Sequence, residues 1–240
     1  MKRLVAILFG SIVINCFAQD SGFEAMIRTI SSMNFTKRSG LVFPQGVQFE
    51  GVDGDVFLNA NWNKTEVRMK GNRGLFSGLP AKYDLQNDQL NILYRNEVKV
   101  IDGGAIQRFS WLDSLSGENQ NYISGTSFTF KGAPLKGFIQ VLVEGRLGLY
   151  DVTTLNIIMP TYNPALSVGS KNVVLEKKIE FFYSDDGKSL KRITKKKDIS
   201  EGLKAYKTEV DKYFKLNSVK VTDKESLIGL FKYLNTLVLN

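Results

Sequence analysis

The sequence from residue 55 to residue 111 reads DVFLNANWNKTEVRMKGNRGLFSGLPAKYDLQNDQLNILYRNEVKVIDGGAIQRFSW. Short runs of alternating apolar residues are interrupted by turn-forming residues every few positions, which is typical of consecutive β-strands. The strands expected from this pattern are 65–69, 79–85, 89–95, 97–101 and 106–111. Because the links between them are so short, neighbouring strands must run antiparallel. This stretch therefore predicts the centre of an antiparallel sheet.

The chain that follows this stretch continues as hairpins and then becomes helical. Further strands are expected at 138–144, 147–155, 173–184 and 189–194, with a Pro- and Gly-containing connection over 156–172. From about residue 198 the spacing of apolar residues changes from two to about 3.6, as in an amphipathic helix. Thr222 and Glu225 have the capping-box spacing that would begin a second helix.

These patterns together predict an α+β fold. We expect one β-rich domain over residues 19–240, helical from about residue 198 onwards. Its mainly antiparallel β-sheet would contain about ten strands, arranged as a meander of hairpins, with two C-terminal α-helices packed on the sheet or its edge. A short amphipathic helix is also expected near 21–33.

Residues 1–18 have the features of a secretory signal peptide. Lys2 and Arg3 precede an apolar run over 4–14, and Cys16 and Ala18 occupy the −3 and −1 positions of a cleavage site after Ala18. The apolar run is shorter than the ~20 residues of a transmembrane helix. Asn15 disfavours a lipoprotein, because that signal requires a small residue before the cysteine. We expect export to the periplasm, the cell surface or the medium.

The composition excludes several chemistries. The 240 residues include no histidine, and the single cysteine is Cys16 in the expected signal peptide. This excludes Ser-His-Asp hydrolases, thiolate nucleophiles, disulfides in the mature chain and the usual zinc sites. No apolar run after residue 18 is long enough for a transmembrane helix. We predict no catalytic residues, no metal site and no cofactor, which favours a non-enzymatic protein.

Two groups of residues are candidates for ligand binding. The first is Tyr162 with Asn163, since an aromatic ring beside an amide suits a sugar or a peptide. The second is a basic group near the end of the sheet, comprising Lys191, Arg192, Lys195, Lys196 and Lys197. This group would suit an anionic partner such as a lipid headgroup or an acidic polysaccharide. Removal of residues 1–18 lowers the formal charge from +8 to +6.

Each candidate also has a simpler structural interpretation. Runs of charge are usually solvated surfaces, and Tyr162 could pack its connection onto the sheet. Nucleic acid is disfavoured as a partner, because the chain is expected to be exported and carries no recognised nucleic-acid-binding motif. The carboxylate pairs Asp185–Asp186 and Asp84–Asp88 could in principle serve a glycosidase. Both pairs, however, lie where hairpin turns require Asp.

Part of this pattern resembles a module of secreted and envelope proteins of Bacteroidetes bacteria. The resemblance covers roughly residues 55–240. The residues that carry it are Phe57, Leu58, Asn59, Trp62, Val67, Gly71, Tyr83, Asp84, Leu85 and Leu90. The matching motifs are structural, so the resemblance implies an exported β-rich protein and brings no catalytic residues.

Three functions remain open at this point. The first is an exported, non-enzymatic envelope protein that binds a ligand or partner on its sheet or loops. The second is a carrier or sensor for a lipid or another apolar ligand in a cavity between sheet and helices. The third is a carbohydrate hydrolase with paired carboxylates, which would need two facing carboxylates ~5–10 Å apart in a cleft.

Overall fold

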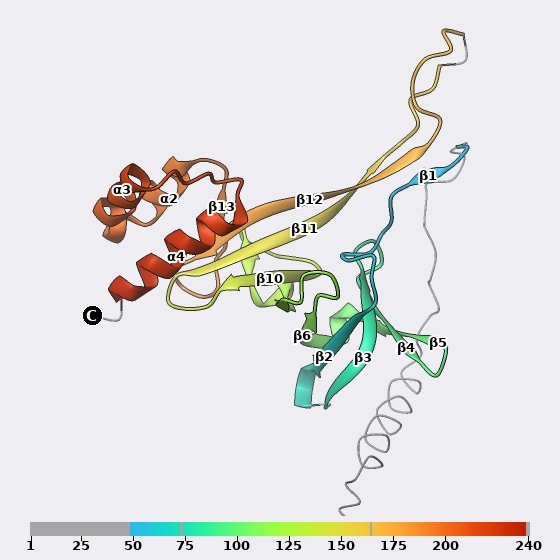
Figure 1. Ribbon diagram of the computed structural model, residues 1–240, viewed down its shortest axis with the longest axis horizontal. Helices are drawn as coiled ribbons and strands as arrows, with labels where there is room; N and C mark the ends of the chain where they lie inside the picture. Colours follow the sequence, from blue (N-terminus) through green and yellow to red (C-terminus); the bar gives the residue numbers. More distant parts are fainter. Residues whose placement is uncertain (1–48, 73, 164, 239–240) are drawn as a thin grey trace, which may run out of the picture. The chain divides into compact units, whose positions relative to one another are not determined.

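The structure is a computed structural model in which residues 49–72, 74–163 and 165–238 are described. It contains a large β-sheet of 11 strands followed by three α-helices (Figure 1). Every strand pair is antiparallel except one, in which the first and twelfth strands run parallel. The predicted α+β fold with a mainly antiparallel sheet is confirmed.

The strands of the first half are β1 (Val52–Asp53), β2 (Asn63–Met69), β3 (Leu75–Asp84), β4 (Gln89–Tyr94), β5 (Glu97–Asp102), β6 (Ile106–Leu112) and β7 (Asn119–Ser124). Those of the second half are β8 (Thr129–Phe130), β9 (Ala133–Pro134), β10 (Phe138–Val143), β11 (Gly148–Ile158), β12 (Val173–Ser184) and β13 (Lys191–Ile193). The α-helices are α2 (Lys196–Gly202), α3 (Lys207–Leu216) and α4 (Lys224–Val238). Short 3-10 helices lie at Lys70–Asn72, Gly103–Ala105, Gly125–Ser127 and Lys204–Tyr206.

The order of the strands in the main sheet is β1-β12-β11-β10-β7-β6-β2-β3-β4-β5, with β13 also paired to β12. The stretch 55–111 contributes the meander of β2, β3, β4 and β5 together with β6, as predicted. β3 begins four residues earlier than expected. It carries a bulge at Gly78, whose φ of +89° suits a glycine, so Pro80 lies inside the strand rather than at its start.

The strand β7 is not among the strands expected from the sequence, because Ser116, Gly117, Asn119 and Asn121 favour turns. Its sequence NQNYIS is mostly polar, and only Tyr122 and Ser124 are buried. β7 nevertheless joins the two halves of the sheet, since it pairs with β6 on one side and β10 on the other. A strand in the middle of a sheet can therefore be polar when one of its faces is exposed.

The two faces of the sheet are covered differently. Cross-strand neighbours face the same side, so the register places Tyr122, Gln140 and Asp151 on one face. The three helices pack on this face of the second half, around Leu149 and Tyr183. The opposite face holds a smaller cluster around Ile139, Val152 and Phe182, against which Phe128 from the loop before β8 packs.

The C-terminal helical region differs from the prediction in two ways. One helix was expected from about residue 198, but the chain forms α2, a 3-10 turn and α3. The capping residue of α4 is Asp223 and not Thr222, since the Ser226 N–H donates to the Asp223 carboxylate at 2.9 Å. The helix α4 is the main contact with the sheet. Its buried side chains are Leu227, Leu230, Phe231 and Leu234.

β11 and β12 extend beyond β10 as a ribbon, and β1 pairs with the far end of β12 (Figure 1). Along residues 152–158, β11 pairs with β12 alone, because its pairing with β10 ends at Asp151. The connection at the end of the ribbon therefore covers 159–172, shorter than the predicted 156–172. The expected signal peptide at 1–18 and the helix near 21–33 lie outside the described residues. None of the helices in the described part of the chain has the length and apolar character to cross a membrane.

Candidate functional site

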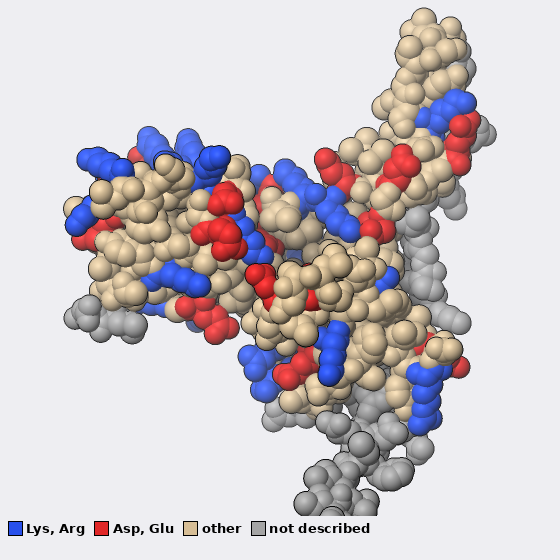
Figure 2. Space-filling model, in the orientation of Figure 1, with Lys and Arg blue, Asp and Glu red and all other residues tan. Residues whose placement is uncertain are grey.

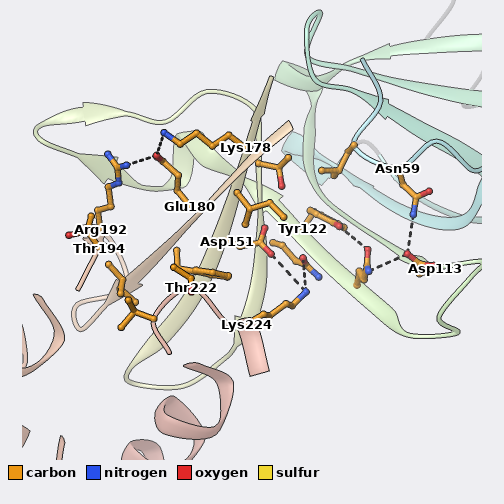
Figure 3. A pocket seen from close by; sticks show the side chains of 18 residues that line it. Asn59, Asp113, Tyr122, Asp151, Lys178, Glu180, Arg192, Thr194, Thr222 and Lys224 are labelled. Carbon is orange, nitrogen blue, oxygen red and sulfur yellow. Dashed lines mark hydrogen bonds and ion pairs between the residues drawn. The ribbon is translucent and has the colours of Figure 1, made fainter. Parts of the chain in front are cut away.

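A cleft of about 640 Å³ lies on the helix-covered face of the sheet. Its floor comes from β7, β10 and β11, and its walls come from β12, from the end of β13 and from the start of α4 (Figure 3). The site thus lies where the sheet passes from its meander half to its helix-covered half. A volume of this size is within the range of small-molecule binding sites.

Asp151 lies at the floor of the cleft, in the middle of β11. The residue is only 5% exposed, yet no hydrogen bond to its carboxylate is formed by the described residues. Burial raises the pKa of this carboxyl to about 6, and the nearby Lys224 only partly opposes the rise. Asp151 is therefore a largely buried acceptor at the cleft, whose ion-pair partner among the described residues, Lys224, lies 3.9 Å away (Figure 3).

Lys224 approaches Asp151 from the first turn of α4. Its ammonium lies 3.9 Å from the Asp151 carboxylate and donates a hydrogen bond of 3.2 Å to Oε1 of Gln140. Since Gln140 is on β10 beside Asp151, the three side chains form one polar group at the bottom of the cleft. The group offers an anionic acceptor and a cationic donor, and it leaves the amide nitrogen of Gln140 available.

A hydrogen-bonded chain of side chains forms the meander side of the cleft. Oε1 of Gln120 accepts from the Tyr122 hydroxyl and from the Trp111 indole, each at 2.9 Å. The Gln120 amide donates to Asp113 at 3.3 Å, and Asn59 donates to the same carboxylate oxygen at 3.0 Å. Burial, with the charges of Asp151 and Asp113, raises the pKa of the Tyr122 phenol, so this hydroxyl stays protonated.

The opposite wall combines apolar side chains with satisfied charges. Ile179 and Phe181 of β12 lie on the same face as Asp151, and Ile179 is 57% exposed. The Glu180 carboxylate forms ion pairs with Arg192 and with Lys178 (Figure 3). The negative charge of Glu180 is thus neutralised within the protein, whereas the apolar surface of Ile179 is open to a ligand.

Of the basic residues proposed from the sequence, Arg192 alone lines this cleft. Lys191 pairs with Asp185 at 2.8 Å and Lys197 pairs with Glu201 at 3.2 Å. The Lys196 ammonium lies 5.1 Å from the centre of the Phe214 ring. Lys195 precedes α2, and its backbone N–H donates to Asp198.

The space-filling view shows basic side chains over the helical part with acidic ones among them (Figure 2). The structure therefore divides the basic group among separate local contacts and does not gather it into one site.

Tyr162 and Asn163 lie far from the cleft, in the connection at the end of the β11–β12 ribbon. The Asn163 side chain accepts from the Ala165 N–H, which is the usual role of Asn in a turn. The Lys171 ammonium lies 4.8 Å from the centre of the Tyr162 ring. Tyr162 thus packs within its own connection, and the structure does not bring these two residues to the other candidates.

The carboxylate pairs considered for catalysis form turns, as their simpler interpretation predicts. Asp186 accepts the backbone N–H groups of Lys188 and Ser189, each at 2.7 Å, and these bonds lower its pKa. Asp84 accepts the backbone N–H groups of Gln86 and Asn87 at 2.9 Å. Asp88 is bonded to the Tyr83 hydroxyl at 2.7 Å.

The residues at the cleft floor were missed by sequence reasoning. One signal was available for Asp151, which interrupts the otherwise apolar run GLYDV in a predicted strand. An acid at such a position is buried, and buried acids are exceptional. Nothing in the sequence pairs Asp151 with Lys224, because only the folded sheet and helix bring them together. Within the described residues, no group of three or more Asp, Glu, Cys or His side chains could hold a metal ion.

No model of a known protein family matches the chain, and neither a curated protein nor a solved structure is significantly similar to it.

Proposed function

We propose that the protein is an exported, non-enzymatic binding protein that holds a hydroxyl-rich ligand, a saccharide of one or two rings, in the cleft. The observation that carries the proposal is the Asp151 carboxylate, which is 5% exposed and has no hydrogen-bond donor from the described residues. A buried acceptor without a donor is costly, so such groups usually have a partner. A ligand hydroxyl in the cleft would supply it.

The side chains around Asp151 favour a sugar over other polar ligands. Vicinal hydroxyls require donors and acceptors side by side, and Lys224, Gln140 and Asp151 provide both. Three threonine hydroxyls add to this set, those of Thr153, Thr194 and Thr222. Sugar rings also have apolar C–H faces, which Ile179 and Phe181 could contact on the opposite wall.

The charges of the cleft favour a ligand without net charge. Its three acidic and three basic side chains balance in number, and they are Asp113, Asp151, Glu180, Lys178, Arg192 and Lys224. An apolar carrier has less support, because the floor of the cleft consists of polar side chains. A hydrolase has less support as well, since Asp113 is used by the Leu115 and Ser116 backbone N–H groups of a turn.

Trp111 gives the experiment a built-in probe. Its indole donates to Gln120, which lines the cleft, so a ligand that displaces this bond should change Trp111 fluorescence. The other tryptophan, Trp62, is removed by Trp62→Phe. We would titrate this variant with neutral monosaccharides, disaccharides and the matching amino sugars, and confirm each hit by calorimetry on the natural chain.

A sugar that binds through Asp151 should lose about tenfold or more in affinity in Asp151→Asn, a loss of ~1.4 kcal/mol or more. The matched control is Asp185→Asn, which alters an exposed aspartate that is paired with Lys191 and does not line the cleft. Equal affinity in the two variants would overturn the assignment of the cleft. Release of a cleaved sugar product during the titration would overturn the non-enzymatic function.

A further inference from the structure

Two arginines face each other on the sheet surface opposite the cleft. The register pairs Arg68 of β2 directly with Arg108 of β6, and both side chains are exposed. Side chains directly opposite on neighbouring antiparallel strands are the closest pairs that a sheet offers. Like charges at such positions repel each other, so the pair costs stability unless something neutralises it.

No close ion pair from the described residues neutralises either arginine. Among the described residues, none forms an ion pair or a hydrogen bond with the Arg68 or Arg108 side chain. Glu66 and Glu144 line the same hollow, but neither lies within 4.0 Å of an arginine nitrogen. By contrast, Arg192 and Lys191 on β13 each have a carboxylate partner.

The hollow around the two arginines is small and polar. It has a volume of about 260 Å³ and contains Ser110, Asn119 and Asn121 from β6 and β7. The hydroxyl and amide groups of these residues can donate hydrogen bonds beside the guanidinium groups. The hollow would therefore surround a compact group on several sides, which a flat charged surface cannot do.

We propose that Arg68 and Arg108 form a binding site for a tetrahedral oxyanion, the phosphate or sulfate group of a small soluble ester. Guanidinium groups match such oxygens with paired, charge-assisted hydrogen bonds. A dianion between the two arginines removes their repulsion and adds an attraction to each. Its remaining oxygens would accept from Ser110 and Asn121, which are themselves cross-strand partners.

This site is distinct from the saccharide cleft. On β7, Asn121 lines the arginine hollow whereas its neighbour Gln120 lines the cleft, and Tyr122 between the two sites touches both. Successive residues of a strand point to opposite faces, so the two sites lie on opposite sides of the same strands. The two proposals rest on different charged side chains, so the failure of either proposal leaves the other intact.

The experiment measures binding of inorganic phosphate, inorganic sulfate and glucose 6-phosphate by calorimetry, with ionic strength held constant by chloride. We expect a Kd of about 1 mM or tighter for at least one of these probes. Arg68→Gln and Arg108→Gln should each weaken binding about tenfold. The matched control is Lys64→Gln, which removes an exposed cation from the same face of β2 outside the hollow.

Glu66→Gln provides a test in the opposite direction. Because Glu66 lines the hollow and repels an anion, its neutralisation should tighten binding about two- to fivefold. Each variant changes one exposed side chain of β2 or β6, so folding should be preserved. Equal affinity in the arginine variants and in Lys64→Gln would overturn the site. No measurable binding of the soluble probes, or binding to phosphatidylglycerol vesicles alone, would overturn it as well.

Discussion

The ammonium of Lys224, in the first turn of α4, lies 3.9 Å from the buried carboxylate of Asp151 on β11. This distance is long for an ion pair, and no shorter bond to the Asp151 carboxylate comes from the described residues. Burial therefore has a larger effect on Asp151 than Lys224 does, and the pKa of the carboxyl is raised to about 6. The pair contacts the ligand cleft, so the same electrostatics affect both stability and binding.

The raised pKa predicts how stability depends on pH. Asp151 binds its proton more tightly in the folded than in the unfolded chain, so its effect on the free energy of unfolding is favourable at low pH. This contribution is complete below about pH 4 and is lost as the pH rises through about 6. In Asp151→Asn this dependence disappears, and at pH 8 the variant should be about 1–3 kcal/mol more stable than the natural chain.

Urea unfolding at pH 4.5 and pH 8 measures this difference directly. Subtracting the variant from the natural chain isolates Asp151, because the turn carboxylates with lowered pKa values, such as Asp186 and Asp198, are present in both proteins. A stability difference that does not change between these two pH values would contradict the raised pKa.

Lys224→Met tests the other half of the pair. The substitution removes the cation beside Asp151 and the donor to Gln140, so the pKa of Asp151 should rise above 6. We expect a loss of about 1–2 kcal/mol in the free energy of unfolding at pH 8 and a smaller loss at pH 5, where Asp151 is protonated. Carboxyl carbon NMR would follow the titration of Asp151. Lys232→Met, at an exposed position of the same helix, is the control and should leave this titration unchanged.

The sequence was sufficient to predict most of the sheet because most strands combine alternation with clear turn signals. The strands 89–94, 97–102 and 106–112 were found to within a residue or two of their bounds. β7 was missed because its exposed residues are polar and its turn signals are dispersed. The break between α2 and α3 was missed because Ile199, Leu203 and Val210 keep helical spacing across it.

The cleft was much harder to predict than the fold. Its floor combines Tyr122, Gln140 and Asp151, which are adjacent only through strand register, and Lys224, which arrives from a helix. A sequence shows turns and periodicity but not which polar residue of one element meets which residue of another. The basic group at 191–197 stood out in the sequence because its members lie close together in the chain, yet folding gives them separate partners.

Asn235 should be the most important polar residue of α4 for stability. Its side chain accepts the Leu147 N–H at 3.0 Å and donates to the Leu147 carbonyl at 2.9 Å, so it attaches the helix to the turn before β11. Asn235→Ala leaves both backbone groups without these bonds and should cost about 2–3 kcal/mol. The control is Asn217→Ala, since the exposed Asn217 donates only to a carbonyl of its own helix and should cost less than ~1 kcal/mol. Equal losses in chemical denaturation would show that the turn is not fixed by Asn235.

Tyr83→Phe tests whether the stretch 55–111 serves the fold or a site. The backbone N–H of Leu58 donates to the Tyr83 carbonyl, and that of Leu85 donates to the Val56 carbonyl. The Tyr83 ring packs against the Phe138 ring, with their centres 5.3 Å apart. Its hydroxyl donates to Asp88, and burial raises its pKa far above the ordinary value.

Removing this hydroxyl should lower the free energy of unfolding by about 1–2 kcal/mol, because Asp88 loses a buried donor. Sugar affinity should stay within twofold, since Tyr83 does not line the cleft. Tyr162→Phe, in the connection beyond the ribbon, is the control for stability and should change it by less than ~0.5 kcal/mol. A large loss of sugar binding in a folded Tyr83→Phe protein would mean that the stretch 55–111 contributes to the site. A loss of stability alone would identify this stretch as the framework that positions β6 and β7 beneath the cleft.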